Sequence, residues 1–411
     1  MPDARFHPSL DFKNASFAGR LIDRVFAAID PGRTLRTKLD SVRHNHPTHI
    51  LAVGKASVAM THAAIEHLGP RFARATVITS DEIAARNQFK NKFVELLVGD
   101  HPLPGARSLE STLKLIEHAR SIPKDHHVLV LISGGTSAML CGIESSEALD
   151  QLVAQTDQLM RAGASIHELN AMRSKLDPIK LGGLAKHLGQ LKTEQIRVYL
   201  LGDVIEQPNA PLESVIGSGP MWAPTRASKI EHMIIADNHT ALDALCAYLA
   251  GEGIGLSHIK RRATGFASDE GAQLAQALLA SDNQVPCAVC LGGEPTVRVG
   301  NNPGIGGPML ELAASAAVEL NGAEFPWTVI SLATDGVDGP SGVAGAVLAH
   351  DMLRDPDAIG QLKSAIERHE TLGICDQLGA TIRTGHTGTN VNDLAIAIHW
   401  PSNHRHKKTD E

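Results

Sequence analysis

The stretch His127-Val-Leu-Val-Leu-Ile-Ser-Gly-Gly-Thr-Ser137 joins an apolar run to a turn made of glycines and hydroxyl residues. A strand that is apolar at nearly every position is buried on both faces, as in a parallel sheet covered by helices. Helical spacing resumes after Ser137, which predicts a strand–turn–helix unit. The stretch therefore favours an α/β fold built on a parallel sheet.

The same pattern occurs on either side of this stretch. Ile50-Leu-Ala-Val-Gly-Lys55 leads into a helix over 56–68, and Val198-Tyr-Leu-Leu-Gly-Asp203 is another apolar run that ends at a glycine. Strands that alternate with helices predict parallel strand–helix–strand units with helices on both faces. Further strands are predicted at 75–79 and 93–98, a helix at 108–120, and helical spacing from residue 12 that Pro31-Gly32 ends.

The alternation restarts after Pro224, which places a domain boundary near residue 228. The second part is predicted to contain strands at 233–236, 257–263, 287–291, 296–299, 327–333 and 394–398, and helices at 238–250, 268–280, 309–320, 341–353 and 357–369. The sequence thus predicts two α/β domains, 1–228 and 229–400, and a disordered tail over 401–411.

Composition excludes several classes of function. The 411 residues carry a formal charge of −7 and are only 3% aromatic, which disfavours nucleic-acid binding. The apolar runs are far shorter than the ~20 residues that span a bilayer, and the first residues show no secretory signal. Few and odd-numbered cysteines indicate reduced thiols and a soluble cytoplasmic protein. Cys287 and Cys290 spell a C-x-x-C, read either as a redox or zinc half-site or as two buried residues on opposite faces of a strand.

Polar residues at strand ends are the candidates for chemistry, because open α/β sheets bind ligands at the carboxyl ends of their strands. The turn Ser133–Ser137 offers backbone N–H groups and hydroxyls to an anion, or it is a tight strand-to-helix turn. Lys55 could neutralise a phosphate or carboxylate, or be a solvated lysine. Carboxylates that can bind Mg²⁺ or accept a proton follow other strands, namely Asp203, Glu294, Asp335 and Asp338.

Glycine is concentrated in the second half of the chain, where eleven of the 37 glycines lie between Gly292 and Gly345. The loop 300–307 is the richest, and its amides could form a nest for phosphates. The loop 385–393 is a second polar loop. Each could equally be a surface loop. No G-x-G-x-x-G follows the first strand, which disfavours a dinucleotide-dependent dehydrogenase.

These motifs, in this order, resemble those of the class II glycerate 2-kinases, whose C-terminal half is called the MOFRL domain and some of whose members carry the label hydroxypyruvate reductase. The resemblance covers about residues 17–398. It rests on the segments 53–56, 99–104, 132–138, 169–173, 179–180, 202–204, 216–220, 236–238, 292–297, 334–340 and 387–391.

The resemblance implies transfer of the ATP γ-phosphoryl group to the 2-hydroxyl of D-glycerate or a related hydroxy acid, with Mg²⁺, in a cleft between two α/β domains. The N-terminal domain would be Rossmann-like. A small hydroxy acid and a nucleotide are the expected partners, and a homodimer is a candidate assembly. The implied catalytic residues are Lys55, Asp203 and Asp335, and the implied metal ligands are Asp203, Asp335 and Asp338. The implied substrate-binding residues are Ser133, Gly134, Gly135, Thr136, Ser137, Arg173 and Lys180. The implied nucleotide-binding residues are Glu294, Gly304, Gly306, Gly307, Thr389 and Asn390.

The sequence departs from the family pattern after the glycine-rich loop. The family has Arg-Asn-Gln-Glu where this chain has Pro308-Met-Leu-Glu311, so a guanidinium to which catalysis is attributed is missing. Arg298 is a candidate replacement. Smaller departures are Thr136, Asp177-Pro178 and His386. The alternative to a glycerate kinase is therefore a non-catalytic or substrate-shifted member that binds a sugar acid or nucleotide. A hydroxypyruvate reductase is a third and weaker hypothesis.

Overall fold

In the computed structural model the described residues are 4–6, 12–41, 45–86, 89–143, 145–161, 166–190, 193, 195–205, 210–223, 229–281, 285–298 and 304–401. Almost all of the tail that was predicted to be disordered, from residue 402 on, lies outside them. The first part of the glycine-rich loop, 300–303, lies outside them as well.

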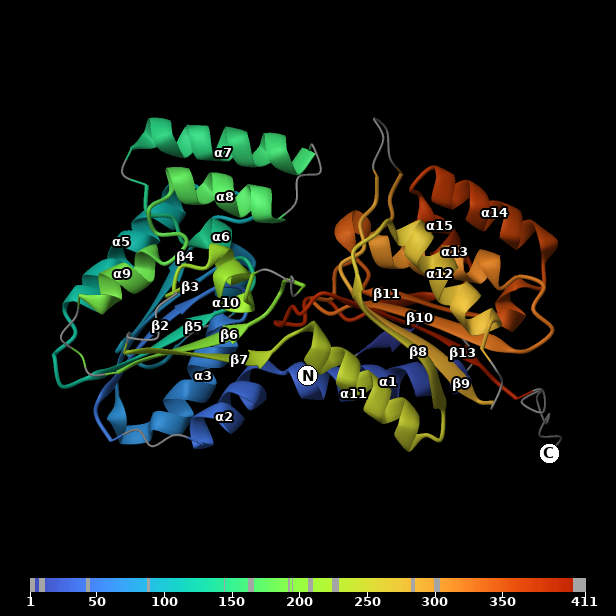
Figure 1. The fold of residues 1–411 in the computed structure, drawn as a ribbon, viewed down its shortest axis with the longest axis horizontal. Coiled ribbons are helices and arrows are strands. Elements are labelled where there is room, and N and C mark those ends of the chain that lie inside the picture. Colours follow the sequence, from blue (N-terminus) through green and yellow to red (C-terminus); the bar gives the residue numbers. More distant parts are fainter. Residues whose placement is uncertain are drawn as a thin grey trace. The chain divides into compact units, whose positions relative to one another are not determined.

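The chain forms two compact units, each with its own sheet (Figure 1). The N-terminal unit comprises Asp30–Asp237 and Gly388–Asn390. The C-terminal unit comprises Met1–Ile29, Asn238–Thr387 and Val391–Glu411. This division differs from the predicted domains in two ways: the boundary lies nine residues after 228, and residues 1–29 belong to the C-terminal unit.

The N-terminal unit contains a six-stranded sheet in which every pair of neighbours is parallel. In sheet order the strands are β4 (Val94–Val98), β3 (Phe72–Thr79), β2 (Thr48–Val53), β5 (His127–Ile132), β6 (Ile196–Leu201) and β7 (Ile230–Ala236). The chain runs outward from β2 to β4, then returns to the other side of β2 at β5. This is the order of a doubly wound sheet, and its switch point lies between β2 and β5.

Helices cover both faces of this sheet, as the sequence predicted. In Figure 1, α2 (Pro31–Asp40) and α3 (Ser57–Leu68) lie on one face, and α5 (Ala106–Arg120) and α9 (Gly183–Gly189) on the other. The first helix, α1 (Phe12–Ile29), ends just before Pro31, as predicted, and Pro31 begins α2 at a position where its missing N–H costs nothing. The remaining helices of the unit are α4 (Asp81–Arg86), α6 (Thr136–Met139), α7 (Ser146–Arg161), α8 (Ile166–Leu176) and α10 (Leu212–Val215).

A chain of imidazoles is buried near the amino-terminal end of β2. His49 Nδ1 lies 2.8 Å from His118 Nε2, and His49 Nε2 lies 2.9 Å from His126 Nδ1. His118 Nδ1 in turn lies 2.9 Å from the Thr76 hydroxyl. Burial, with the neighbouring imidazoles and Arg74, lowers the pKa of His49 to about 4 and that of His118 to about 3.

The C-terminal unit contains a seven-stranded mixed sheet. In sheet order the strands are β1 (Arg5–Phe6), β12 (Thr381–Arg383), β11 (Gly345–Ala349), β10 (Trp327–Ala333), β13 (Asp393–His399), β9 (Cys287–Gly293) and β8 (Gly255–Ala263). All neighbours are antiparallel except β8 and β9. The unit is α/β, as predicted, but its sheet is not a parallel one.

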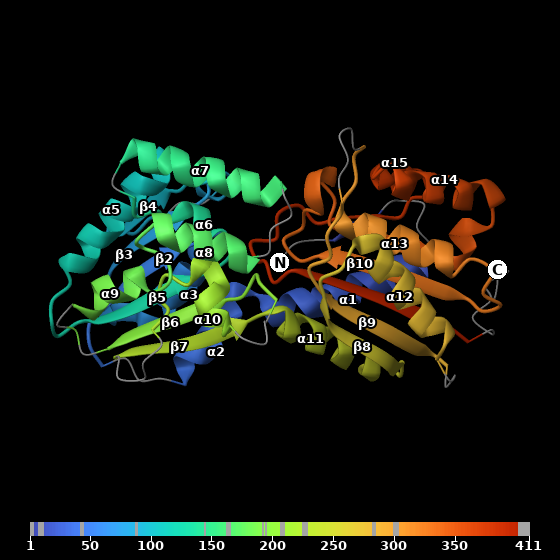
Figure 2. The same cartoon turned by 45° about the horizontal axis from the view of Figure 1, so that its top comes forward.

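Helices cover both faces of the mixed sheet too. In Figures 1 and 2, α1 (Phe12–Ile29) and α11 (Asn238–Gly251) lie on one face, and the other helices on the opposite face. These are α12 (Ala267–Leu279), α13 (Pro308–Glu319), α14 (Pro356–Glu367) and α15 (Thr371–Gln377). Four alanines of α13 are fully buried, namely Ala313, Ala314, Ala316 and Ala317. This core of small side chains explains how a chain so poor in aromatic residues packs two layers of helices.

Two predicted elements of this unit are wrong. The helix predicted over 341–353 is interrupted by the strand β11, because Gly342 and Gly345 have φ of +71° and +152° and a helix cannot contain them. Short apolar runs fit a buried strand as well as a helix. The strand predicted at 296–299 is reduced, among its described residues, to one bridge between Thr296 and Phe266.

Candidate active site

The switch point of the parallel sheet brings together the first two predicted motifs. Lys55 N–H donates to Gly134 O at 2.8 Å, and Ser133 N–H donates to Val53 O at 3.1 Å. Ala56 N–H donates to the Ser133 hydroxyl at 3.0 Å. Gly54 has φ +120°, and a side chain there would collide with Ser133. The turns after β2 and β5 therefore pack directly on each other.

Two of the predicted substrate-binding hydroxyls are occupied by this packing. Ser133 and Thr136 are buried, and the Thr136 hydroxyl lies 3.0 Å from Val53 O and 2.7 Å from Ser133 O. Gly135 and Ser137 are half-buried and remain accessible from the same turn. The helix that follows, α6, has only four residues, so its dipole adds little attraction for an anion.

Asp203, which follows β6, lies against the same turn. A Cβ on Gly134 would approach Asp203 Oδ2 to 2.5 Å, so only glycine admits the carboxylate at this distance. Burial raises the pKa of Asp203 to about 6, although the Lys55 cation and the Gly135 N–H both act to lower it. Asp203 Oδ1 is buried and has no hydrogen-bond partner among the described residues. A carboxylate with this pKa and an unused oxygen is suited to accept a proton or to bind a cation.

A further pair of residues, Ser218 and Asn170, supports the turn from behind. Ser218 Oγ lies 2.9 Å from Ser137 Oγ and donates to Asn170 Oδ1 at 2.7 Å. Ser218 lies between Gly217 and Gly219 in three successive left-handed residues, with φ of +60°, +64° and +58°. The segment 216–220 contributes to the family resemblance, but the sequence analysis assigns Ser218 no role. Serine adopts positive φ only at a cost, so a serine between two glycines was the sequence signal that could have indicated a functional position.

Arg173 is three residues after Asn170 on α8, so both side chains project from the same face of that helix. Burial lowers the pKa of its guanidinium, and no charged partner contributes to that shift. A half-buried guanidinium of this kind is suited to bind a carboxylate or phosphate.

Lys180 has a different place from the one the resemblance implies. Its side chain is fully buried, and its ammonium donates to Ser137 O at 2.8 Å and to Leu140 O, and lies 3.5 Å from Asp177 Oδ2. Asp177 Oδ1 accepts hydrogen bonds from the N–H groups of Gly142 and Ile179. Lys180 thus donates to two carbonyls of the segment 137–140 and pairs its charge with Asp177, so that it holds α6 within the fold.

In the C-terminal unit, the predicted carboxylates gather at the ends of β10 and β9. Asp338 accepts from Met309 N–H at 2.9 Å and from Leu310 N–H at 2.8 Å, and so caps α13. Burial, together with Asp335 and Glu311, raises the pKa of Asp338 to about 7. Asp335 Oδ1 accepts from Val337 N–H.

Asp393 belongs to the same group of carboxylates and was not predicted. Burial raises its pKa well above the usual value, and Asp338, Glu294 and Asp335 raise it further. Sequence gave no direct signal, because Asp393 is the first residue of an apolar strand whose pairing with β9 and β10 brings it beside these groups.

The described glycines of the richest loop face other parts of the same unit. A Cβ on Gly304 would meet Glu370, one on Gly306 would meet Thr371, and one on Gly307 would meet Asp338. Pro308 begins α13, and Glu311 Oε2 lies 2.8 Å from His369 Nδ1. Arg298, the candidate replacement for the missing guanidinium, lies over the Phe266 ring at 4.5 Å. These glycines are accounted for by packing alone.

The second polar loop is more open. Gly385 and Gly388 have φ of +62° and +77°, and no atom of the described residues lies within 4 Å of a Cβ built on either. Thr389 is buried and Asn390 is half-buried, and both are grouped with the N-terminal unit. Glu294 is exposed, and its N–H donates to Ala263 O. Left-handed glycines with open surroundings let phosphates approach the backbone.

The donor set fits Mg²⁺ only in a limited way. Among the described residues, no cluster of three or more His, Cys, Asp or Glu side chains is arranged to hold a metal ion. Mg²⁺ is usually held by one or two carboxylates together with substrate phosphates. The unpartnered Asp203 Oδ1 is suited to be such a ligand.

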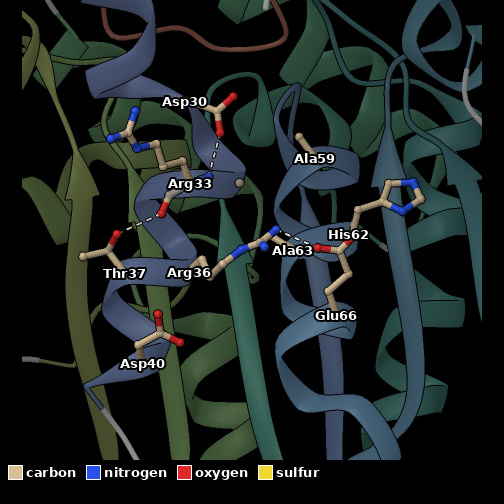
Figure 3. A pocket seen from close by; sticks show the side chains of 10 residues that line it. Asp30, Arg33, Arg36, Thr37, Asp40, Ala59, His62, Ala63 and Glu66 are labelled. Carbon is tan, nitrogen blue, oxygen red and sulfur yellow. Dashed lines mark hydrogen bonds and ion pairs between the residues drawn. The ribbon is translucent and has the colours of Figure 1, made fainter.

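A polar pocket of about 460 Å³ lies away from these residues, between α2 and α3 (Figure 3). Arg36 and Glu66 form an ion pair of 2.6 Å at its rim, and both are largely exposed. None of the predicted site residues lines it. In the described part of the chain, no helix is both long and apolar enough to span a bilayer.

Comparisons with known proteins agree with this architecture. Residues 17–247 match a domain of unknown function (DUF4147), and residues 287–393 match the MOFRL family. The chain is 26% identical to the D-glycerate 2-kinase of Thermotoga maritima over 92% of its own length and 96% of that protein's. It is 29% identical to a putative hydroxypyruvate reductase of Agrobacterium vitis, over 85% and 98% of the two chains.

The crystal structure of glycerate kinase from Thermotoga maritima superimposes with a TM-score of 0.81 at 26% identity, and covers 93% of this chain and 99% of that one. The first match includes the whole parallel sheet, and the second includes strands β9 to β12 of the mixed sheet. The chain belongs to the glycerate kinase (DUF4147/MOFRL) family.

Proposed function

We propose that this protein transfers the γ-phosphoryl group of ATP to a hydroxyl of D-glycerate, at the 2-position, or of a related small hydroxy acid. The observation that carries the proposal is the group of Lys55, Asp203, Gly135 and Ser137 at the switch point of the parallel sheet. Relatives in the same family are named glycerate 2-kinases. Phosphoryl transfer requires positioning and electrostatic stabilisation more than covalent chemistry from the protein.

Each of these polar groups is assigned a role in this reaction. Asp203 accepts the proton of the attacking hydroxyl through its unpartnered oxygen, and Lys55 stabilises the charge that develops. Arg173 binds the carboxylate of the acid. Lys180 positions the turn 133–137 rather than contacting the substrate. Mg²⁺, when bound, supplies positive charge to the phosphate oxygens, and Asp203, Asp335 and Asp338 remain its candidate ligands.

The nucleotide is proposed to bind through the open loop that contains Thr389 and Asn390, and Glu294 remains a candidate polar contact. Gly304, Gly306 and Gly307 shape the start of α13 and contribute backbone only. This assignment is supported by a contrast between the two loops. The surroundings of Gly385 and Gly388 are open, whereas those of Gly304, Gly306 and Gly307 are filled.

The test is an ADP-release assay with D-glycerate, tetronates and other small hydroxy acids as acceptors. We expect turnover with at least one of them and none with Asp203→Asn. Absence of ADP release with every acceptor, in a preparation whose two units are folded, would refute the kinase.

Pro308 supports a second candidate, a family member that binds a sugar acid or nucleotide without catalysis. The side chain at this position has no charge, and Arg298 lies on Phe266 instead. A thermal shift by ADP or glycerate without any turnover would favour this candidate, and a measurable kcat would remove it. Oxidation of NADH with hydroxypyruvate would instead support the reductase label of some relatives.

A further inference from the structure

The hydrogen bonds behind the Ser137 turn have a fixed direction. Ser218 has one hydroxyl proton, and it is donated to Asn170 Oδ1 at 2.7 Å. The contact of 2.9 Å between the two serine hydroxyls must then be donated by Ser137 and accepted by Ser218. The proton of Ser137 is therefore directed into the fold.

The surroundings keep this arrangement in place. Ser218 is fully buried and Asn170 is 6% exposed, so water does not compete for these bonds. The backbone at Ser218 is held by hydrogen bonds, because the carbonyl of Ser218 accepts from Leu181 N–H at 3.0 Å and that of Gly219 accepts from Gly182 N–H at 2.8 Å. The carbonyl of Ser137 is also occupied, since it accepts from Lys180.

These hydrogen bonds determine whether Ser137 donates to a ligand or accepts from it. Its Oγ retains only lone pairs, so toward a ligand it acts as a hydrogen-bond acceptor and not as a donor. An acceptor attracts a hydroxyl or ammonium group and repels a carboxylate or an ether oxygen. The prediction that the hydroxyls of this turn bind an anion does not fit this polarity at Ser137.

We propose that Ser137, oriented by Ser218 and Asn170, is a specificity residue that accepts a hydrogen bond from a second hydroxyl of the acid. The preferred ligands are then hydroxy acids that carry a hydroxyl besides the one that is phosphorylated. This inference rests on the proposed function for the location of the acid. The conclusion that Ser137 accepts a hydrogen bond from the ligand rests only on the hydrogen bonds among Ser137, Ser218 and Asn170.

The experiment measures binding by calorimetry, without nucleotide, for three probes that differ in one group. D-Glycerate has the second hydroxyl, D-lactate lacks it, and the 3-O-methyl ether of glycerate replaces it with an acceptor. For the wild type we expect about tenfold weaker binding of lactate, the effect of one lost hydrogen bond, and still weaker binding of the ether. Ser137→Ala should bind glycerate and lactate equally.

The variant Ser218→Gly tests the direction of the Ser137 hydroxyl without a loss of folding. Glycine prefers the positive φ of position 218, so the variant should fold, but it releases the proton of Ser137. We expect this variant to gain affinity for the methyl ether, by several-fold over the wild type. Ser174→Ala is the control, because Ser174 lies on α8 with Asn170 and, within the described part of the chain, its hydroxyl donates only to Ala171 O.

The proposal is overturned if the wild type binds glycerate and lactate equally, if it binds none of the probes, or if Ser218→Gly gains nothing for the ether. Its failure is distinct from failure of the kinase. Selective binding of glycerate without ADP release would remove the proposed reaction and leave the specificity residue. ADP release without discrimination among the probes would support the proposed reaction and remove Ser137 as a specificity residue.

Discussion

At the residue scale, the pKa of Asp203 predicts how activity depends on pH. A carboxyl that accepts the proton of the substrate must be ionised, and burial raises its pKa to about 6. We therefore expect kcat/KM to rise about tenfold per pH unit below about 6 and to level off above it. The measurement is the pH profile of ADP release with saturating nucleotide.

Lys55 supplies an internal check on this assignment. Its cation lowers the pKa of Asp203, so Lys55→Met should move the inflection of any residual activity to higher pH. If the inflection of this variant stays at the wild-type pH, the inflection does not report the ionisation of Asp203.

Gly134 gives a second prediction at this scale. The methyl group of Gly134→Ala would lie 2.5 Å from Asp203 Oδ2, so the carboxylate must move. We expect a loss of roughly a hundredfold in kcat/KM, the effect of displacing a reacting group by about 1 Å. Gly189→Ala is the matched control, since nothing lies within 4 Å of its Cβ. Equal activity of the two variants would contradict the role of Asp203.

At the element scale, Lys180 and Asp177 form a buried ion pair that holds α6. Removal of one partner leaves the other charge buried and unpaired, so Lys180→Met should reduce the free energy of unfolding of the N-terminal unit by about 3–5 kcal/mol. The double variant with Asp177→Leu should recover part of this loss. Urea titrations of the three proteins measure both effects. A single variant as stable as the wild type would show that the pair contributes nothing.

The strands and turns of the N-terminal unit were predictable because their signals are local. An apolar run followed by Gly54 or by Gly134-Gly135 indicates a strand end wherever it occurs. The role of Lys180 was not predictable, because its partners are carbonyls forty residues away that folding brings to it. Strand β11 was missed for a related reason: its short apolar run forms a strand only because β10 lies beside it.

At the scale of the whole molecule, the imidazole chain makes the stability of the N-terminal unit depend on pH. His49 and His118 are neutral in the fold, with a pKa of about 4 and about 3, whereas both would titrate near 6.5 when unfolded. The unfolded chain binds more protons below pH 6.5, so stability is complete above that pH and falls as the pH drops toward 4. The shift of His49 alone corresponds to about 3 kcal/mol.

The fluorescence of Trp222 can follow this unit separately, because the other two tryptophans, Trp327 and Trp400, belong to the C-terminal unit and can be replaced by Phe. Urea midpoints between pH 4 and 7.5 should decline on the acid side. Replacement of His49 and His118 by Gln should flatten that decline, whereas replacement of the exposed His258 should not. If the urea midpoint of the double variant still declines at acid pH, the decline does not come from His49 and His118.

The position of β13 has a consequence for how the chain is made. Residues 393–399 are translated after the other six strands of their sheet, yet they pair with β10 on one side and β9 on the other. Until they emerge, the nascent sheet is divided into two halves, each with an unpaired edge. The six parallel strands end at Ala236 and need no later strand. Synthesis should thus complete one sheet early and leave the other open to aggregation until its middle strand arrives.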